Sequence, residues 1–226
     1  MNLAQTFNQG MVYPPIPSTS PVIFVVDDDL SVRESLELLI RSEGWQPETF
    51  QSAREFLTRP RPLVPSCLIL DLALPDLNGL ELQKIIARER AEMPIIFVSG
   101  CGDIPVTVRA MKAGAVDFLV KPFGNAELLR AIREGLDRSR GVLDHEVELG
   151  SLRNCYRSLS PRERQVMALV TSGLLNKQVG AELGISEITV KAHRGQVMRK
   201  MKANSLADLV KMAASLWPAR QTIHLA

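Results

Sequence analysis

The chain has 226 residues, of which 46% are hydrophobic and 5% aromatic, so it can hold one large domain or two small ones. Its net charge of +2 hides an asymmetry, because residues 21–140 carry 15 Lys and Arg against 18 Asp and Glu, whereas residues 153–226 carry 12 against 4. An acidic front and a basic back predict two domains, the second meeting a polyanion. The three cysteines show no CxxC spacing, which argues against a disulfide framework. No apolar run is long enough to span a membrane, and the first 20 residues contain no Lys or Arg to start a signal peptide. We therefore expect a cytoplasmic protein with no membrane partner.

The front of the chain predicts an α/β fold. Residues 1–20 contain Pro14-Pro15-Ile16-Pro17 and are expected to form a flexible leader. Five strand-like segments then alternate with helical patterns, which predicts a doubly wound, five-stranded parallel sheet over residues 21–140. A mixed, partly helical linker is expected over 141–157. The predicted strands are Val22–Val26, Gln46–Phe50, Cys67–Leu70, Ile95–Ser99 and Asp117–Val120.

The back of the chain, over 158–226, predicts an all-α domain of four short helices. Ser160-Pro161-Arg162-Glu163 opens the first helix with an N-cap, a Pro at the first helical position and a Glu three residues after the cap. Asn176–Leu183 and Ser186–Met201 are separated at Gly184 and have the dimensions of a helix-turn-helix. A last helix is expected to end at about Leu216.

Acidic residues follow two of the apolar strands. Asp27, Asp28 and Asp29 end the first strand, and Asp71 ends the third. Because chemistry in such a sheet gathers at the carboxyl ends of the strands, Asp27, Asp28 and Asp71 are expected to converge and to need a hard divalent cation. The alternative is that these acids only cap the following helices.

Two further groups are expected to reach the same cluster. Ser99 ends the fourth strand and Lys121 the fifth. A cis bond between Lys121 and Pro122 would turn the chain and aim the amine inward.

Over about residues 21–140 this set resembles the receiver domain of bacterial two-component response regulators, a flavodoxin-like sheet. The matching pieces are Val25-Val26-Asp27-Asp28, Leu70-Asp71 with Pro75-Asp76 and Gly79, Val98-Ser99-Gly100, and Phe118-Leu-Val-Lys121-Pro122-Phe123. The resemblance implies that Asp71 accepts a phosphoryl group from a sensor histidine kinase. It also implies Mg²⁺ held by Asp27, Asp28, Asp71 and the Ala73 carbonyl, with Ser99 and Lys121 on the phosphoryl oxygens.

The same resemblance gives Phe118 a switching role. Phe118 would report phosphorylation to a dimer face made by the helix Pro105–Ala113, the last strand and the helix Asn125–Glu134. The alternative is that Phe118 is an ordinary buried aromatic. In receivers the positions of Ala73 and Cys101 influence dephosphorylation, and the apolar Ala73 favours a longer-lived phosphoryl form.

From about residue 157 to 217 the chain looks like the LuxR/FixJ-type DNA-binding domain. The motifs are Leu159–Arg164, Gly173, Asn176-Lys177-Gln178, Leu183–Ser186 and Thr189–Arg194. The likeness puts Lys191, Ala192 and Gly195 at base-reading positions and Lys177, Thr189 and Arg194 at phosphate contacts. Glu163 is expected to be structural, as capping box or ion-pair partner, and the last helix to pair two copies on DNA.

These expectations combine into a phosphorylation-dependent transcriptional regulator that is not an enzyme and that binds double-stranded DNA as a homodimer, with RNA polymerase as a further candidate partner. One alternative is an aspartyl-phosphate phosphatase, but those enzymes place a second Asp where this chain has Ala73. Another is an interaction module whose receiver is never phosphorylated, against which the complete set of three Asp, one Ser and one Lys argues.

Overall fold

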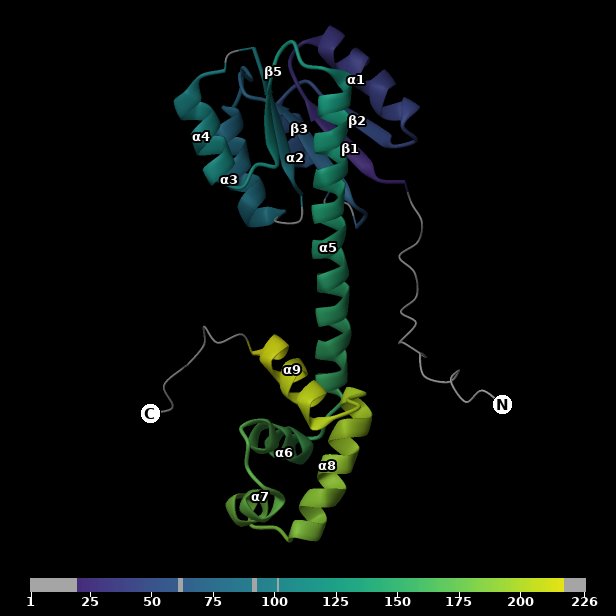
Figure 1. Ribbon diagram of the computed structural model, residues 1–226, viewed down its shortest axis with the longest axis vertical. Coiled ribbons are helices and arrows are strands. Elements are labelled where there is room, and N and C mark those ends of the chain that lie inside the picture. The colour runs from purple at the N-terminus through teal and green to yellow at the C-terminus, as the bar shows by residue number, and fades with distance from the viewer. Residues whose placement is uncertain (1–19, 61–62, 91–92, 101, 218–226) are drawn as a thin grey trace, which may run out of the picture. The chain divides into compact units, whose positions relative to one another are not determined.

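The computed structural model describes residues 20–60, 63–90, 93–100 and 102–217. The predicted leader, apart from Ser20, and Cys101 lie outside these ranges. The chain forms two compact units, one up to Leu143 and one from Asp144, and each is described by itself. Figure 1 follows the chain through both. Within the described ranges, no helix is long and apolar enough to cross a bilayer.

The first unit contains the predicted parallel sheet. Its strands are β1 (Val22–Val26), β2 (Gln46–Phe50), β3 (Ser66–Asp71), β4 (Ile95–Ser99) and β5 (Asp117–Val120). All neighbours are parallel, in the order β2-β1-β3-β4-β5. Every residue of β1, β3 and β4 is buried, which is why these strands read as continuous apolar runs, whereas the edge strand β2 is half-exposed and more polar. The α/β prediction is confirmed.

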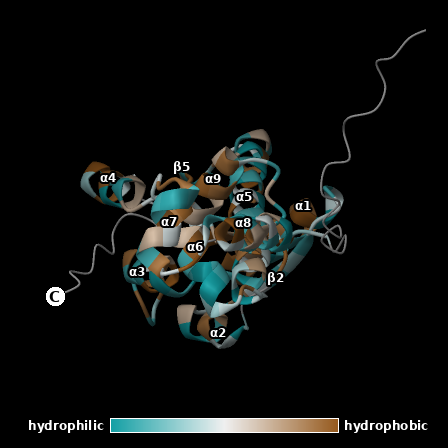
Figure 2. Cartoon of the chain, turned by 90° about the horizontal axis from the view of Figure 1, so that it is seen from below, coloured by the Kyte–Doolittle hydropathy of each residue, from teal (hydrophilic) through white to brown (hydrophobic). Residues whose placement is uncertain are grey.

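Helices cover both faces of this sheet. The helices α1 (Leu30–Ser42) and α5 (Asn125–Arg157) pack on the face that carries Ile23, Val25 and Ile69. The other face is covered by α2 (Ala53–Thr58), α3 (Gly79–Glu89) and α4 (Ile104–Lys112). Figure 2 shows hydrophilic and hydrophobic residues on different sides of the same helices, as expected for helices with one buried face.

The helix α5 is longer than the sequence indicated. It runs without a break from Asn125 to Arg157, so the segment 141–157, expected as a mixed linker, is helical throughout. Its first part buries Leu128, Ile132 and Leu136 against the sheet. Its end, at Cys155 and Tyr156 among others, packs in the second unit.

The second unit contains the four predicted helices. They are α6 (Pro161–Thr171), α7 (Asn176–Leu183), α8 (Glu187–Met201) and α9 (Leu206–Leu216). Gly184 joins α7 to α8 with a φ of 64°, the left-handed conformation that glycine adopts without strain. One small core lies among α6, α8, α9 and the end of α5, and another among α6, α7 and α8. The predicted all-α helix-turn-helix architecture is confirmed.

Glu163 has both structural roles that its position suggested. It forms the capping box with Ser160, and its carboxylate also accepts hydrogen bonds from Lys200 Nζ at 2.7 and 3.0 Å. Only 6% of Glu163 is exposed, so these bonds are made largely away from water. Glu163 therefore ties the start of α6 to the end of α8.

We predict that Glu163→Ala lowers the free energy of unfolding of the second unit by about 2 kcal/mol, because the variant loses a cap and removes the carboxylate that pairs with Lys200. Lys200 and Ser160 hold the pKa of Glu163 below its usual range, so this stabilisation is present at neutral pH and is lost as the pH falls through that lowered pKa. Urea unfolding at several pH values measures both effects.

The matched control is Glu187→Ala, which removes an exposed pair with Lys191 on α8. An exposed pair of this kind contributes no more than about 0.5 kcal/mol. Equal losses in the two variants would contradict the structural role assigned to Glu163.

Candidate functional site: an acidic cluster and a basic helix pair

Three carboxylates converge at the carboxyl ends of β1 and β3. Ligand oxygens of Asp27, Asp28 and Asp71 all lie within 4.8 Å of one another. Asp27 and Asp71 are buried and Asp28 is exposed, so one side of the cluster is open to solvent. The topology accounts for this meeting, because β1 and β3 are parallel neighbours whose chains turn outward at the same edge of the sheet.

Lys121 brings one positive charge to the cluster. Its Nζ lies 2.7 Å from Asp27 Oδ2 and 3.2 Å from Asp71 Oδ1. The Lys121–Pro122 peptide bond is cis, as predicted. One ammonium group therefore bridges the two buried acids, in line with the sequence prediction.

Burial sets the electrostatics of Asp71. Removal from water raises the pKa of the Asp71 carboxyl, the charge of Asp27 adds to the rise, and Lys121 opposes it. Burial acts to lower the pKa of Lys121, but the hydrogen bond to Asp27 and the charge of Asp71 outweigh it and the pKa is raised. Lys121 is therefore held in its charged form, whereas burial disfavours the ionised form of Asp71.

The other predicted site residues lie around Asp71. The backbone N–H of Ala73 donates to Asp71 Oδ2 at 3.1 Å, and Ala73 itself is exposed at the rim. Ser99 is 3% exposed at the last position of β4, the strand that pairs with β3. Ser99 is thus on the strand next to Asp71, at the same edge of the sheet.

Sequence reasoning assigned no contact to two residues close in sequence to the acids of the cluster, Arg33 and Asp76. Arg33 on α1 donates to the Asp27 carbonyl oxygen at 2.7 Å. Asp76 accepts from the backbone N–H groups of Ala53 and Arg54 at 3.3 and 2.9 Å, so it caps α2 from the loop that follows Asp71. The contact of Arg33 spans six residues, so the predicted helix that follows Asp27 could have indicated it. The contacts of Asp76 span more than 20 residues, and no local sequence pattern predicts them.

Asp29 caps the helix that follows it, as the alternative interpretation of the acids predicted. Its carboxylate accepts from Ser31 N at 2.8 Å and caps α1. Its own N–H donates to Asp27 Oδ1 at 3.0 Å. Of the four acids at these two strand ends, Asp29 is therefore a cap, and the other three form the cluster.

Phe118 lies on β5, on the side of the sheet that α3 and α4 cover. It is half-buried and stacks on Phe97 of β4, with ring centroids 6.1 Å apart. Ser99 is two residues beyond Phe97 on the same strand, so side-chain alternation puts Ser99, Phe97 and Phe118 on one side. A displacement of Ser99 can therefore reach Phe118 without crossing the sheet.

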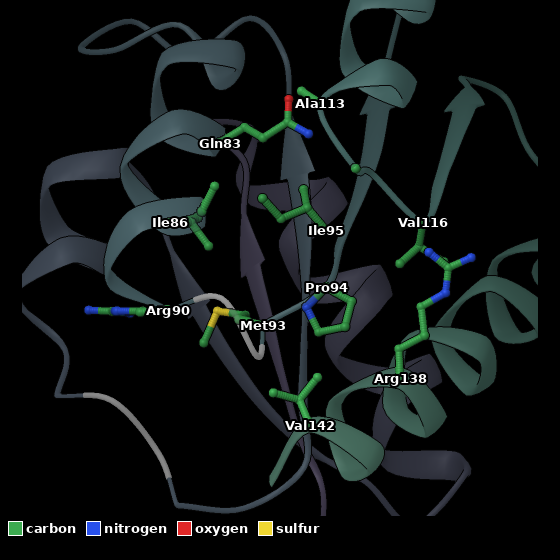
Figure 3. A pocket seen from close by; sticks show the side chains of 12 residues that line it. Gln83, Ile86, Arg90, Met93, Pro94, Ile95, Ala113, Val116, Arg138 and Val142 are labelled. Carbon is green, nitrogen blue, oxygen red and sulfur yellow. The ribbon is translucent and has the colours of Figure 1, made fainter. Parts of the chain in front are cut away.

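Two of the hollows in the first unit are lined by described residues. One, of about 430 Å³, adjoins Lys121 and is lined by α1 and by the start of the segment after β5, including Ser35, Leu39 and Phe123. The other, of about 330 Å³, lies at the amino ends of β4 and β5 (Figure 3). Its described lining, which includes Gln83, contains no acidic residue, and it is at the opposite edge of the sheet from Asp71. Of these two hollows, the first shares Lys121 with the acidic site, and the second shares none of its residues.

The predicted DNA-contacting residues lie on α7 and α8. All are exposed except Arg194, which is half-buried; the set is Lys177, Thr189, Lys191, Ala192, Arg194 and Gly195. Val190, Val197 and Met201 occupy the buried face of α8, as the periodicity predicted. The outward faces of the helix pair therefore carry most of these candidates.

Three of these residues already have partners within the domain. Arg194 Nη1 donates to Asn176 Oδ1 at 3.1 Å, and the hydroxyl of Thr189 lies 2.8 Å from that of Ser186. Lys191 Nζ lies 3.0 Å from Glu187. Arg194 thus joins α8 to the start of α7.

Two family models match the chain. The response regulator receiver domain matches residues 23–133, and the luxR family of bacterial regulatory proteins matches residues 157–213. The two matches fall in the two structural units described above.

Curated relatives and solved structures agree with these matches. The chain is 53% identical over 199 residues to nodulation protein W of Bradyrhizobium diazoefficiens, covering 88% of each chain. It is 47% identical to the response regulator protein TodT of Pseudomonas putida, covering 86% of each. It is 43% identical to the transcriptional regulatory protein FixJ of Azorhizobium caulinodans, covering 88% of this chain and 93% of that one. The structure of the response regulator StyR matches with a TM-score of 0.76 and 46% identity, over 86% of this chain and 98% of that one.

Proposed function

The chain belongs to the response regulators that join a receiver domain to a LuxR-type DNA-binding domain, and from this premise we propose that Asp71 is its phosphoacceptor. Such proteins are transcriptional regulators of two-component systems, whose partners are a sensor kinase and DNA. The observation that carries the proposal is the pair of contacts from Lys121 to Asp27 and Asp71 at the open acidic cluster.

The donor set fits a magnesium ion. Three carboxylates whose ligand oxygens come within 4.8 Å of one another offer the hard oxygen ligands that Mg²⁺ prefers. Asp28 and Asp71, the carbonyl of the exposed Ala73, and Asp27 directly or through water would hold it. Bound Mg²⁺ would supply positive charge against the phosphoryl oxygens.

In the proposed reaction an Asp71 carboxylate oxygen attacks the phosphorus of a phosphohistidine. A new oxygen–phosphorus bond forms, and the nitrogen–phosphorus bond to the kinase histidine breaks. Phosphoryl transfer depends mainly on positioning and on charge neutralisation, which the Lys121 ammonium provides. The hollow between α1 and the segment after β5 opens beside Lys121 and gives the donor protein a surface to approach.

The phosphoryl group would then move the switch residues. Lys121 and the Ser99 hydroxyl each gain a charge-assisted hydrogen bond of about 1.5–3 kcal/mol. Two such bonds match the roughly 5.5 kcal/mol that turns a 1:99 population into 99:1. Ser99 moves toward the phosphoryl group, and Phe118, on the same side of the sheet, turns into the space that it leaves.

The proposed dimer face lies next to Phe118. Ile104, Val108 and Met111 form an exposed apolar stripe along α4, and Val120 continues it on β5. Arg130 of α5 pairs with Asp117 at 2.7 Å at the edge of this face. An exposed apolar stripe with a charged margin has the composition of a protein–protein interface.

We predict that Val108→Asp abolishes beryllofluoride-driven dimerisation while leaving phosphorylation by acetyl phosphate intact, because the new carboxylate would be buried between two copies. Val108 is 44% exposed, so the change should cost the folded monomer little. Light scattering with and without beryllofluoride and Mg²⁺ gives the result. Leu38→Asp, on the exposed side of α1, is the matched control and should dimerise normally. A monomer in both variants would contradict the assignment of the face.

For the second unit we propose that α8 enters the major groove of a duplex, and that Lys177, Thr189 and Arg194 contact phosphates while Lys191, Ala192 and Gly195 face bases. A dimer would then read half-sites about one helical turn apart. Because its ligand is DNA, we place the protein in the cytoplasm, and RNA polymerase is a candidate partner at the promoter.

The experiment that tests the proposal is incubation with acetyl phosphate and Mg²⁺ followed by intact-mass spectrometry. We expect one phosphoryl group per chain, lost on treatment with hydroxylamine, which cleaves acyl phosphates. Steady turnover of small phosphate esters with no retained phosphoryl group would instead favour the phosphatase alternative. Against that alternative, this chain has Ala73 where such phosphatases have a second Asp.

A further inference from the structure

Ile188 is exposed in a domain that buries or half-buries most of its large aliphatic side chains. It is the second residue of α8, and 80% of it is exposed, whereas Val190 and Val197 on the same helix are at most 1% exposed. Its exposure is the largest in the second unit among the described large hydrophobic residues. Packing of the domain therefore does not account for this isoleucine.

Ile188 belongs to an open apolar strip. Ala192 and Gly195 follow it at intervals of four and three residues, which puts all three on one face of α8. Ala192 is exposed, and a Cβ atom added at Gly195 would meet nothing within 4 Å. The strip therefore has one large apolar side chain at the helix start and free space along the next two turns.

The surroundings of the strip are cationic. The sequence of α8 contains four Lys or Arg residues and one Glu, so the helix carries a net positive charge. Lys191 lies next to Ala192, and Arg194 next to Gly195. An apolar strip flanked by cationic side chains is complementary to a polyanion that carries apolar groups between its charges. An apolar protein surface or a membrane interior would not require the flanking cations.

The major groove of DNA offers one apolar group on the base edges, the 5-methyl group of thymine. In a helix-turn-helix the amino-terminal residues of the second helix reach those edges. We propose that Ile188 contacts a thymine methyl group in each half-site and so selects an A·T pair there. The small Ala192 and Gly195 allow the close approach that this contact needs. The inference rests on the proposed binding of DNA by α8.

The test uses the full-length protein with beryllofluoride and Mg²⁺ and a duplex that the wild type selects from a random library. Each thymine is replaced in turn by deoxyuridine, which lacks only the methyl group. At one position in each half-site we expect the wild type to lose about fourfold in affinity, the amount for one buried methyl-sized group. Ile188→Ala should bind the thymine duplex about as weakly and should show no further loss with deoxyuridine.

Leu175→Ala is the matched control, because Leu175 is 71% exposed but precedes α7 instead of lying on α8. It should retain the sensitivity to deoxyuridine. The inference is overturned if no position is sensitive in the wild type, or if Ile188→Ala keeps the same sensitivity. A third outcome also overturns it. If the only effect of Ile188→Ala is a higher affinity in the absence of beryllofluoride, equal for the thymine and the deoxyuridine duplex, then Ile188 contacts another part of the protein and not DNA. Failure of the wild type to select any duplex would refute DNA binding itself, whereas selection without methyl sensitivity refutes only the role of Ile188.

Discussion

An Asp71→Asn variant will take up no phosphoryl group from acetyl phosphate, and it will remain monomeric in the presence of phosphodonor and Mg²⁺. The amide lacks the anionic oxygen that attacks phosphorus, and it weakens the carboxylate cluster as a site for a divalent cation. We expect the loss to be complete, because Asp27 is held by Lys121 and Asp28 lies at the exposed rim. Intact-mass spectrometry and light scattering measure the two effects.

The fold of this variant should survive. Burial raises the pKa of Asp71, so its ionised form is disfavoured in the folded protein, and a neutral amide removes that cost. The unfolding free energy at neutral pH should therefore be equal to or higher than that of the wild type. Asp29→Asn is the matched control, because Asp29 caps α1, Asn is an equally good cap, and phosphoryl uptake should persist. Phosphoryl uptake by Asp71→Asn would show that another residue is the acceptor.

Gly180→Ala will destabilise the second unit by about 1–3 kcal/mol, the usual cost of overpacking a well-packed site. A Cβ atom at Gly180 would lie 2.8 Å from the Ile185 carbonyl oxygen, closer than such atoms approach. The Gly180 carbonyl also accepts from Ile185 N at 3.0 Å, so the turn cannot move without losing that bond. Because this contact sets how α7 meets α8, affinity for DNA should fall with stability. Urea unfolding and duplex titration measure the two quantities.

Gly195→Ala is the contrasting substitution on the neighbouring helix. Nothing lies within 4 Å of its added Cβ atom, and the change to Ala favours the helix by up to about 1 kcal/mol. In the absence of DNA this variant should be as stable as the wild type or more so. Equal destabilisation by both changes would mean that loss of glycine itself, and not the contact with Ile185, is responsible.

The sheet and the acidic cluster could be predicted because both depend on short-range signals. Runs such as Val22–Val26 are apolar throughout only when a strand is buried on both faces, and the acids that end these runs must meet at one edge of a parallel sheet. Lys121 could be predicted to reach the same site because it ends the fifth strand and is followed by Pro122. The half-exposed edge strand β2 gave a weaker signal for the same physical reason.

The length of α5 and the long-range contacts could not be predicted. Gly141 and Gly150 interrupt the helical pattern, and α5 buries residues in the cores of two different units, so no single apolar stripe runs along it. The Asp76 cap on α2 and the contact between Lys200 and Glu163 join residues far apart in sequence. Such pairs form through tertiary packing, which a local sequence pattern does not predict.

The affinity of the full-length protein for a duplex that it selects, measured with and without beryllofluoride and Mg²⁺ at one ionic strength, tests the central claim most directly. We predict that activation tightens binding by roughly 5- to 150-fold, the range of coupling between two linked sites. The same addition should leave Asp71→Asn unchanged. Equal affinity of the wild type in both conditions would contradict the claim that a phosphoryl group at Asp71 controls binding to DNA.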